Sequence, residues 1–246
     1  MGELIAVLSG KGGTGKTSVC AGVATALADT GVRVLCIDCD VGLRNLDISL
    51  GMTDCGALSF LDVSEGDYTL DQAPRHPSYP SLAFLTAPMN RSAEKIDTQA
   101  FTAMLRQARR KFDYVFLDAP AGVDAGFQLA ASDADRFLLV TGPGPAAVRD
   151  ATRVGELLEL MGKKNIRMVV NRVSKNMLST LRLTIDDIMD ASGLPLVGVV
   201  LEDVNVTLAA ACGQPLLKFA GRSSAAGACR RIAKRIQGLP EPITFR

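Results

Sequence analysis

The sequence has little of what marks membrane-spanning, disulfide-bonded or disordered proteins. No run approaches the roughly 18 unbroken apolar residues that a membrane-spanning helix needs, and no basic segment opens the chain as in a signal peptide. Six cysteines in 246 residues are too sparse for a disulfide framework. With 23 glycines and 11 prolines, collagen-like and low-complexity classes are excluded. Because 48% of the residues are hydrophobic, the chain is too apolar for disorder. We expect a globular, cytoplasmic protein.

The chain has almost no net charge, but its charges are unevenly distributed. The formal net charge is +1. Between Val204 and Pro240 there is no acidic residue, whereas six are basic: Lys218, Arg222, Arg230, Arg231, Lys234 and Arg235. A basic surface there would suit a polyanionic partner, either lipid or nucleic acid. The alternative is that the last four of these residues form only the solvated face of a final helix.

Histidine and paired cysteines, which often bind metals, are scarce. The one histidine, His76, stands in a proline-containing stretch, 51–81, that predicts an irregular surface excursion. We expect its side chain to be exposed and without a catalytic role. Cys36 and Cys39 form a C-x-x-C pair at the end of a predicted strand. Their odd spacing puts the sulfur atoms on opposite faces, so we expect ordinary buried cysteines.

Apolar runs of strand length alternate with helix-length periodic segments from end to end. Strands are predicted at 4–9, 33–38, 82–87, 114–118, 137–141, 167–171 and 197–200. Helices are predicted at 16–29, 97–111, 146–161, 184–191, 205–211 and 224–237, with Asp97 as an N-cap and Gly31 and Gly193 at C-terminal ends. The alternation implies one α/β domain over residues 1–246, with a mostly parallel central sheet of about seven to eight strands and helices on both faces.

A glycine-rich loop lies between the first predicted strand and the first helix. Residues 10–17 match the phosphate-loop pattern G-x-x-x-x-G-K-[ST]. Its glycines let backbone N–H groups converge on phosphate oxygens, and the following helix adds the positive end of its dipole. Lys16 can reach the terminal phosphates, and the Thr17 hydroxyl can bind Mg²⁺. The residues predicted to hold the phosphates are Gly10, Lys11, Gly12, Gly13, Thr14, Gly15, Lys16, Thr17 and Ser18.

A second lysine near the start of this loop, Lys11, is not explained by an ordinary phosphate cradle. The segment Lys11-Gly-Gly-Thr-Gly-Lys16-Thr17 resembles the deviant Walker A motif K-G-G-x-G-K-[ST]. That motif is found in the superfamily of septum-site regulators, plasmid-partition ATPases, arsenite-pump ATPases and the nitrogenase iron protein.

Three further segments resemble the MinD group of that superfamily, and the resemblance covers residues 4 to about 237. The run from Asp38 to Asp47, D-C-D-V-G-L-R-N-L-D, is similar to its switch segment. Asp118-Ala-Pro-Ala-Gly122 resembles its D-x-P-A-G segment. Val170-Asn-Arg-Val173 and Gly198-Val-Val-Leu-Glu-Asp203 resemble the late segments that surround the adenine base.

The resemblance implies a Mg²⁺-dependent ATP hydrolase, and therefore P-loop NTPase architecture. Two ATP-loaded monomers would form a homodimer in which Lys11 of each reaches the phosphates of the other, much as an arginine finger does. It implies catalytic roles for Lys11, Lys16, Asp40 and Asn45, with Asp40 orienting the attacking water. Magnesium would be held by Thr17, Asp38 and Asp118. Contacts to the base of ATP or ADP would come from Asn171, Arg172, Glu202 and Asp203. The paired carboxylates at 38 and 40 have an alternative interpretation as capping and loop-ordering groups.

By the same resemblance, the protein would regulate septum placement in cell division, with MinC-like or MinE-like partners, at the inner face of the cell membrane. The chain departs from the group in two places. Residues 238–246 contain two prolines, which leave no room for the C-terminal amphipathic helix by which MinD proteins insert into the membrane. Leu201 stands where the group usually has proline. The sequence therefore does not predict whether the protein binds a membrane, whereas neither departure affects the predicted ATP binding.

Three other functions in the superfamily compete with this prediction. A ParA-type partition ATPase would bind DNA nonspecifically, which the basic 204–240 segment favours and the G-L-R-N-L-D run opposes. A flagellar-number regulator usually carries an extra N-terminal motif, and here the first predicted strand begins at residue 4. A redox iron–sulfur protein would need cysteines near residues 118–122, and none occurs between Cys55 and Cys212.

Overall fold

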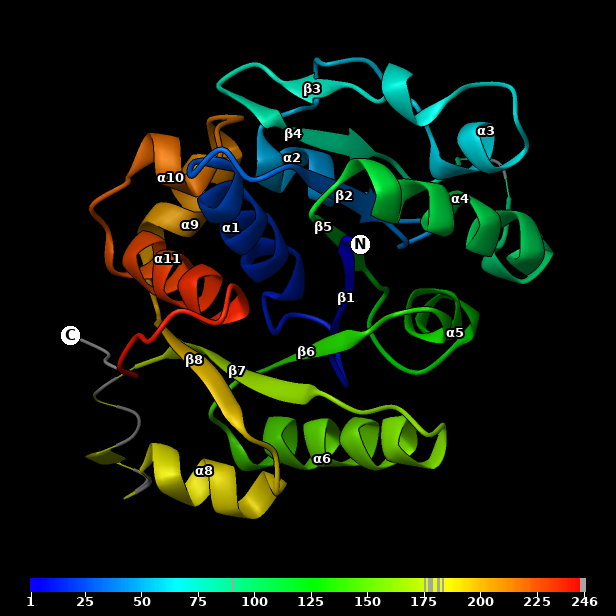
Figure 1. Cartoon of the computed structure of the whole chain (residues 1–246). Helices are drawn as coiled ribbons and strands as arrows, with labels where there is room; N and C mark the ends of the chain where they lie inside the picture. The colour runs from blue at the N-terminus through cyan, green and yellow to red at the C-terminus, as the bar shows by residue number, and fades with distance from the viewer. Residues whose placement is uncertain (90, 175, 177–178, 181, 183, 244–246) are drawn as a thin grey trace.

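The computed structural model describes residues 1–89, 91–174, 176, 179–180, 182 and 184–243. Within these residues eight strands form one sheet in the order β3-β4-β2-β5-β1-β6-β7-β8 (Figure 1). The strands are β1 (Glu3–Leu8), β2 (Val34–Asp38), β3 (Arg75–His76), β4 (Tyr79–Leu85), β5 (Tyr114–Asp118), β6 (Arg136–Thr141), β7 (Ile166–Val173) and β8 (Leu196–Leu201). All neighbouring strands pair in parallel except β3 and β4. The predicted fold class is therefore confirmed.

Helices cover both faces of the sheet (Figure 1). One apolar core joins the sheet to α1 (Lys16–Ala28), α2 (Leu46–Leu50), α9 (Val204–Ala211), α10 (Leu216–Phe219) and α11 (Ser224–Ile236). The other joins it to α3 (Phe60–Ser64), α4 (Thr98–Lys111), α5 (Ala125–Ser132), α6 (Pro145–Leu160) and α8 (Ile185–Ser192). In β1, Ile5 and Val7 belong to the first core, and Leu4 and Leu8 to the second. Because both faces are buried, the strands are continuously apolar rather than alternating.

Several short elements were not predicted, and some of them lie in the stretch taken for an irregular excursion. Residues 51–81 contain α3, β3 and the first residues of β4. Helix α3 is five residues long and depends on a capping box between Ser59 and Asp62. Helices α2, α5 and α10 were also missed; they have five, eight and four residues, too few to show a helical period. The caps predicted at Asp97 and Gly193 are confirmed, since Asp97 accepts from two backbone N–H groups and Gly193 is the left-handed C-cap of α8. The cap predicted at Gly31 was misplaced, because the C-cap of α1 is Asp29 and Gly31 follows it with a φ of +84°.

The expectation of an exposed His76 was wrong. Its side chain is 2% exposed, and Nε2 lies 2.9 Å from the carbonyl oxygen of Leu50. Nδ1 accepts hydrogen bonds from the N–H groups of Ser78 and Tyr79, at 3.0 and 3.1 Å. Burial lowers the pKa of the imidazole, in keeping with a neutral ring that donates through Nε2. His76 is thus a structural residue that closes the β3–β4 turn onto α2, and no local sequence pattern indicates that contact.

The cysteine prediction is confirmed. Cys36 packs in the core under α1 and Cys39 in the opposite core. No disulfide occurs among the described residues, where all six cysteines are free thiols. None of the described helices is both long and apolar enough to cross a bilayer. At the C-terminal end, residues 239–243 have no helical structure, and 244–246 lie outside the described residues.

Candidate functional site

The phosphate loop connects the end of β1 to the start of α1, as predicted. Gly13 and Gly15 have φ values of +77° and +81°, in the left-handed region that glycine tolerates without strain. At Gly10 a Cβ atom would lie 2.8 Å from the backbone carbonyl of Asp150 on α6, too close for any side chain. The glycines therefore permit both the loop conformation and its close contact with α6. The loop ends at the N-terminus of α1, where unpaired N–H groups and the helix dipole favour an anion.

Lys16 and Asp118 form a buried ion pair beneath this loop. Lys16 Nζ lies 2.7 Å from Oδ1 of Asp118 and 3.4 Å from the hydroxyl of Thr17. The two charged residues are 7% and 1% exposed. Burial lowers the pKa of Lys16, but the charge of Asp118 and the hydrogen bond to it more than offset that effect, so the pKa stands above its usual value. The structure thus brings together three predicted site residues from α1 and β5.

Asp38 ends the neighbouring strand and organises the switch segment that follows. β2 and β5 pair with Asp38 opposite Asp118. The Asp38 carboxylate accepts hydrogen bonds from the N–H groups of Asp40, at 2.9 Å, and Leu46, at 3.2 Å. Burial, and next the charge of Asp118, raise its pKa to about 7. These contacts match the loop-ordering interpretation of the 38/40 pair and put Asp38 at the edge of the phosphate site.

Three of the predicted catalytic residues, Lys11, Asp40 and Asn45, are at least partly accessible to solvent. Lys11 and Asn45 are exposed and Asp40 is half-buried. Asn45 is the residue that precedes α2, and its side chain makes no capping bond. Between them Leu43 is 72% exposed and Arg44 has a φ of +43°.

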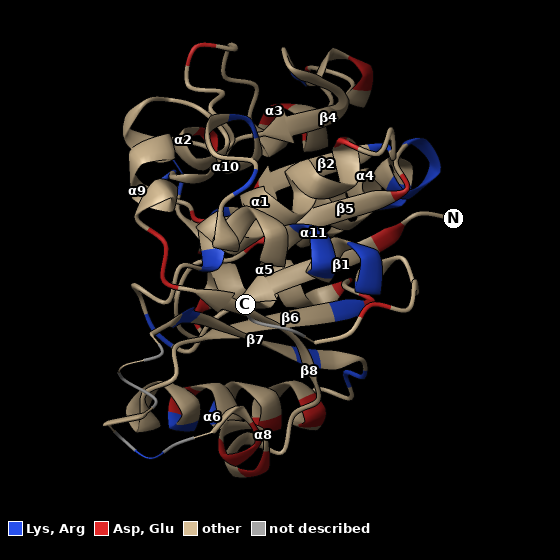
Figure 2. Cartoon of the chain, turned by 90° about the vertical axis from the view of Figure 1, so that its left-hand side faces the viewer, with Lys and Arg blue, Asp and Glu red and all other residues tan. Residues whose placement is uncertain are grey.

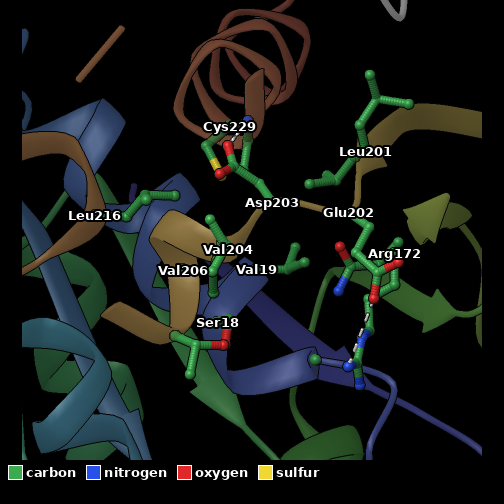
Figure 3. A pocket seen from close by; sticks show the side chains of 15 residues that line it. Ser18, Val19, Arg172, Leu201, Glu202, Asp203, Val204, Val206, Leu216 and Cys229 are labelled. Carbon is green, nitrogen blue, oxygen red and sulfur yellow. Dashed lines mark hydrogen bonds and ion pairs between the residues drawn. The ribbon is translucent and has the colours of Figure 1, made fainter. Parts of the chain in front are cut away.

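The predicted base-contacting residues line a pocket of about 430 Å³ next to the phosphate loop (Figure 3). Asn171, Arg172, Glu202 and Asp203 contribute from the ends of β7 and β8, and Gly15 and Ser18 from the loop and α1. The other lining residues, which were not predicted, are Val19, Val200, Leu201, Val204, Val206, Thr207, Leu216, Ala225 and Cys229. Most are apolar, as is usual for a pocket that binds a flat ring. From the sequence they cannot be distinguished from core residues.

Asp203 shapes this pocket rather than presenting a free carboxylate to it. Oδ1 accepts from the N–H of Asn205 at 3.0 Å, which caps α9. Oδ2 accepts from the N–H of Ala225, at 3.0 Å, and the hydroxyl of Ser224, at 3.1 Å, at the start of α11. Although burial opposes it, these hydrogen bonds lower the pKa of Asp203 to about 2. One carboxylate therefore ties together the N-terminal ends of the two helices that form one wall of the pocket.

The oxygen groups near Lys16 suit magnesium better than a transition metal. The hydroxyl of Thr17 and the carboxylates of Asp38 and Asp118 are hard oxygen ligands, and Mg²⁺ keeps several waters and phosphate oxygens in its shell. In the described part of the chain no group of three His, Cys, Asp or Glu side chains is arranged to hold a metal. The residues present therefore fit a Mg²⁺ ion whose remaining ligands come from water and from the phosphates of a nucleotide.

Because the pKa of Asp38 is raised from 3.8 to about 7 on folding, stability without nucleotide and Mg²⁺ should depend on pH. The folded state holds this proton more tightly, so the contribution of Asp38 falls as pH rises from about 4 to about 7. Each pKa unit is worth about 1.4 kcal/mol. Asp38→Asn should therefore gain several degrees of Tm over wild type between pH 5 and pH 8, as followed by circular dichroism. The exposed Asp190→Asn should give no such trend, and parallel curves for Asp38→Asn and wild type would contradict the prediction.

A strand, a glycine-rich loop and a helix that begins with Lys16 and Thr17 define a P-loop nucleotide-binding protein. The sequence model of the CobQ/CobB/MinD/ParA nucleotide binding domain matches residues 5–216. The chain belongs to that family, and within it to the MinD-like septum-site-determining group, as the resemblance predicted.

The relatives in sequence and in structure include MinD proteins from several organisms. The septum site-determining protein MinD of Synechocystis is 37% identical over 245 residues, covering 99% of this chain and 92% of the relative. MinD of Bacillus subtilis is 37% identical over 250 residues, with coverage of 99% and 92%. The MinC:MinD cell division protein complex of Aquifex aeolicus aligns with a TM-score of 0.90 at 34% identity over 98% of each chain. MinD of Pyrococcus horikoshii, solved with Mg-ADP, aligns with a TM-score of 0.83 at 29% identity over 96% of each chain.

Proposed function

We propose that this protein is a Mg²⁺-dependent ATPase that dimerises when ATP is bound and thereby regulates septum placement. The observation that carries the proposal is the complete phosphate loop with an additional, exposed lysine, Lys11, on its outer side. Its MinD relatives support this function, and the Pyrococcus horikoshii relative was solved with Mg-ADP. A ParA-family ATPase of Chlorobium tepidum shares only the fold at 24% identity, so the DNA-partition alternative gains no support from it.

Each site residue would have a separate role in phosphoryl transfer. Backbone N–H groups of the loop and the N-terminus of α1 hold the phosphates, and Lys16 turns from Asp118 toward them. Lys11 of the partner protomer neutralises charge that develops on the transferred phosphoryl group. Asp40 orients the attacking water, with Asn45 completing the same loop. Thr17, Asp38 and Asp118 would hold Mg²⁺ when it binds, and the ion would supply charge neutralisation between the phosphates.

Light scattering with size-exclusion chromatography tests the switch directly. The chain is expected to elute as a monomer with Mg-ADP and as a dimer with Mg-ATP when turnover is slow. A hydrolysis-deficient Asp40→Ala variant should lengthen the lifetime of the dimer. A monomer with both nucleotides, in wild type and variant alike, would contradict the proposed mechanism.

The proposal includes a MinC-like or MinE-like partner and a location at the inner face of the cell membrane. A MinC partner is supported by the Aquifex aeolicus relative, whose structure is titled as a MinC:MinD complex. Membrane binding would rely on the basic residues of α11, which Figure 2 shows as blue bands along the helix. The helix buries Cys229, Ile232 and Ile236 on its other side. However, one of these positive charges is already neutralised within the protein, since Lys234 forms an ion pair with Glu241 at 2.9 Å.

Sedimentation with anionic liposomes, together with a DNA-retention assay, tests whether this basic surface binds membrane or DNA. Retention with ATP but not ADP would support ATP-dependent membrane binding through α11. A charge-reversed Arg231→Glu variant should then lose retention while it still dimerises. Retention on DNA instead, weakening steeply with salt, would favour the partition alternative.

A further inference from the structure

Two consecutive side chains at the end of β7 hold two consecutive carbonyl groups of the phosphate loop. Asn171 Nδ2 donates to the carbonyl oxygen of Thr14 at 2.8 Å. Arg172 Nη1 donates to the carbonyl oxygen of Gly13 at 2.9 Å. The two segments are 157 and 159 residues apart in sequence, so these contacts are made only by the fold.

The backbone of β7 is bent so that both side chains reach the loop. In a regular strand successive side chains point to opposite faces. Here the pairing of β7 with β8 shifts register between Val170 and Val173, and Arg172 has a φ of +57°. A left-handed conformation is unfavourable for arginine, so its neighbours must hold it there. The irregularity brings Arg172 to the same side as Asn171.

Because a peptide group is planar and trans, fixing a carbonyl also fixes the N–H that follows it. The carbonyl group of Gly13 lies in one plane with the N–H group of Thr14. In the same way, the carbonyl group of Thr14 lies in one plane with the N–H group of Gly15. We infer that Asn171 and Arg172 are positioning residues: by holding these two carbonyls outward, they aim the N–H groups of Thr14 and Gly15 at the phosphate chain of the nucleotide. The inference rests on the proposed ATP binding and extends it, since the resemblance assigns these residues to the base.

The packing around the two contacts agrees with this role. Asn171 is 6% exposed, and a Cβ atom at Gly15 would lie 2.3 Å from its Nδ2. The loop and the amide are therefore in direct contact, which only glycine allows. Arg172 is exposed, and its Nη2 lies 3.9 Å from the carboxylate of Glu202, which limits where the guanidinium can turn. The loop conformation thus depends on β7 as well as on its own glycines.

Binding of a phosphate chain without a base tests the inference. Isothermal titration should compare Mg-ATP and Mg-tripolyphosphate on wild type, Asn171→Ala and Arg172→Ala. Since each variant loses one hydrogen bond to the loop, we expect both ligands to bind about five- to tenfold more weakly. Arg172→Lys, which can still donate one bond, should recover part of the loss. Arg167→Ala removes an exposed arginine near the other end of β7 and serves as the control.

Different failures have different meanings. If the variants lose affinity for ATP but bind tripolyphosphate as wild type does, the two residues act on the base and the inference is overturned. Tripolyphosphate that does not bind wild type overturns it too, because the loop then does not hold phosphates independently of the base. Wild type that binds neither ligand overturns the proposed function and the inference together. Thermal melting confirms that each variant is folded, and the exposed Arg172 keeps one variant free of burial effects.

Discussion

Lys11→Ala is expected to lower ATP turnover on the order of a thousandfold while ATP binding to the monomer is retained. A cation supplied across a subunit interface to the transferred phosphoryl group is worth about 10³–10⁵ in kcat. Lys11 is exposed, and in the described residues its ammonium group forms no ion pair or hydrogen bond. Its removal should therefore leave stability unchanged. Steady-state phosphate release and nucleotide titration measure the two effects, with the exposed Lys95→Ala as control.

Mixing two inactive variants shows whether Lys11 acts in its own site or in the partner's. An Asp40→Ala protomer keeps Lys11, and a Lys11→Ala protomer keeps Asp40. In a mixed dimer the site of the Lys11→Ala protomer would have its own Asp40 and receive Lys11 from its partner. We therefore expect the mixture to recover turnover that neither variant has alone. A mixture as inactive as its components would show that Lys11 does not act in trans.

The sequence predicted the parts of the fold that repeat and missed those that depend on single contacts. Long apolar runs such as 114–118 became strands with the same bounds because burial on both faces leaves no alternative for them. His76 was misjudged because its partners are backbone groups, one of them 26 residues earlier at Leu50. The short helices α2 and α3 depend on Asp38 and on the Ser59 capping box, not on an apolar period.

In the functional site, too, the local pattern was predictable and the contacts between distant segments were not. The phosphate loop was predictable because its sequence pattern is local: a set of glycines followed directly by the start of a helix. The base pocket was only partly predictable, since Val206, Leu216 and Cys229 come from separate helices and look like core residues. The contacts of Asn171 and Arg172 with the loop could not be predicted, because both segments must be placed in space before the hydrogen bonds exist.

Lys16→Met is expected to abolish ATP binding and also to destabilise the fold by roughly 3–5 kcal/mol, because it leaves the buried Asp118 charge without its partner. The two effects have different causes and can be separated. In the double variant Lys16→Met, Asp118→Asn the uncompensated charge is removed, so most of the stability should return. ATP binding should not return, because the lysine that reaches the phosphates is still missing.

Urea unfolding of the two variants measures the stabilities, and a surface ion pair of the same length provides the control. Arg33 and Asp113 are also 2.7 Å apart, but their side chains are 56% and 43% exposed. Water screens such pairs, so Arg33→Met should destabilise the fold far less than Lys16→Met does. If Lys16→Met lowered the free energy of unfolding no more than Arg33→Met does, burial would not increase the contribution of the Lys16–Asp118 pair to stability. If the double variant were as unstable as Lys16→Met, the loss would come from packing of the lysine stem and not from the unpaired carboxylate.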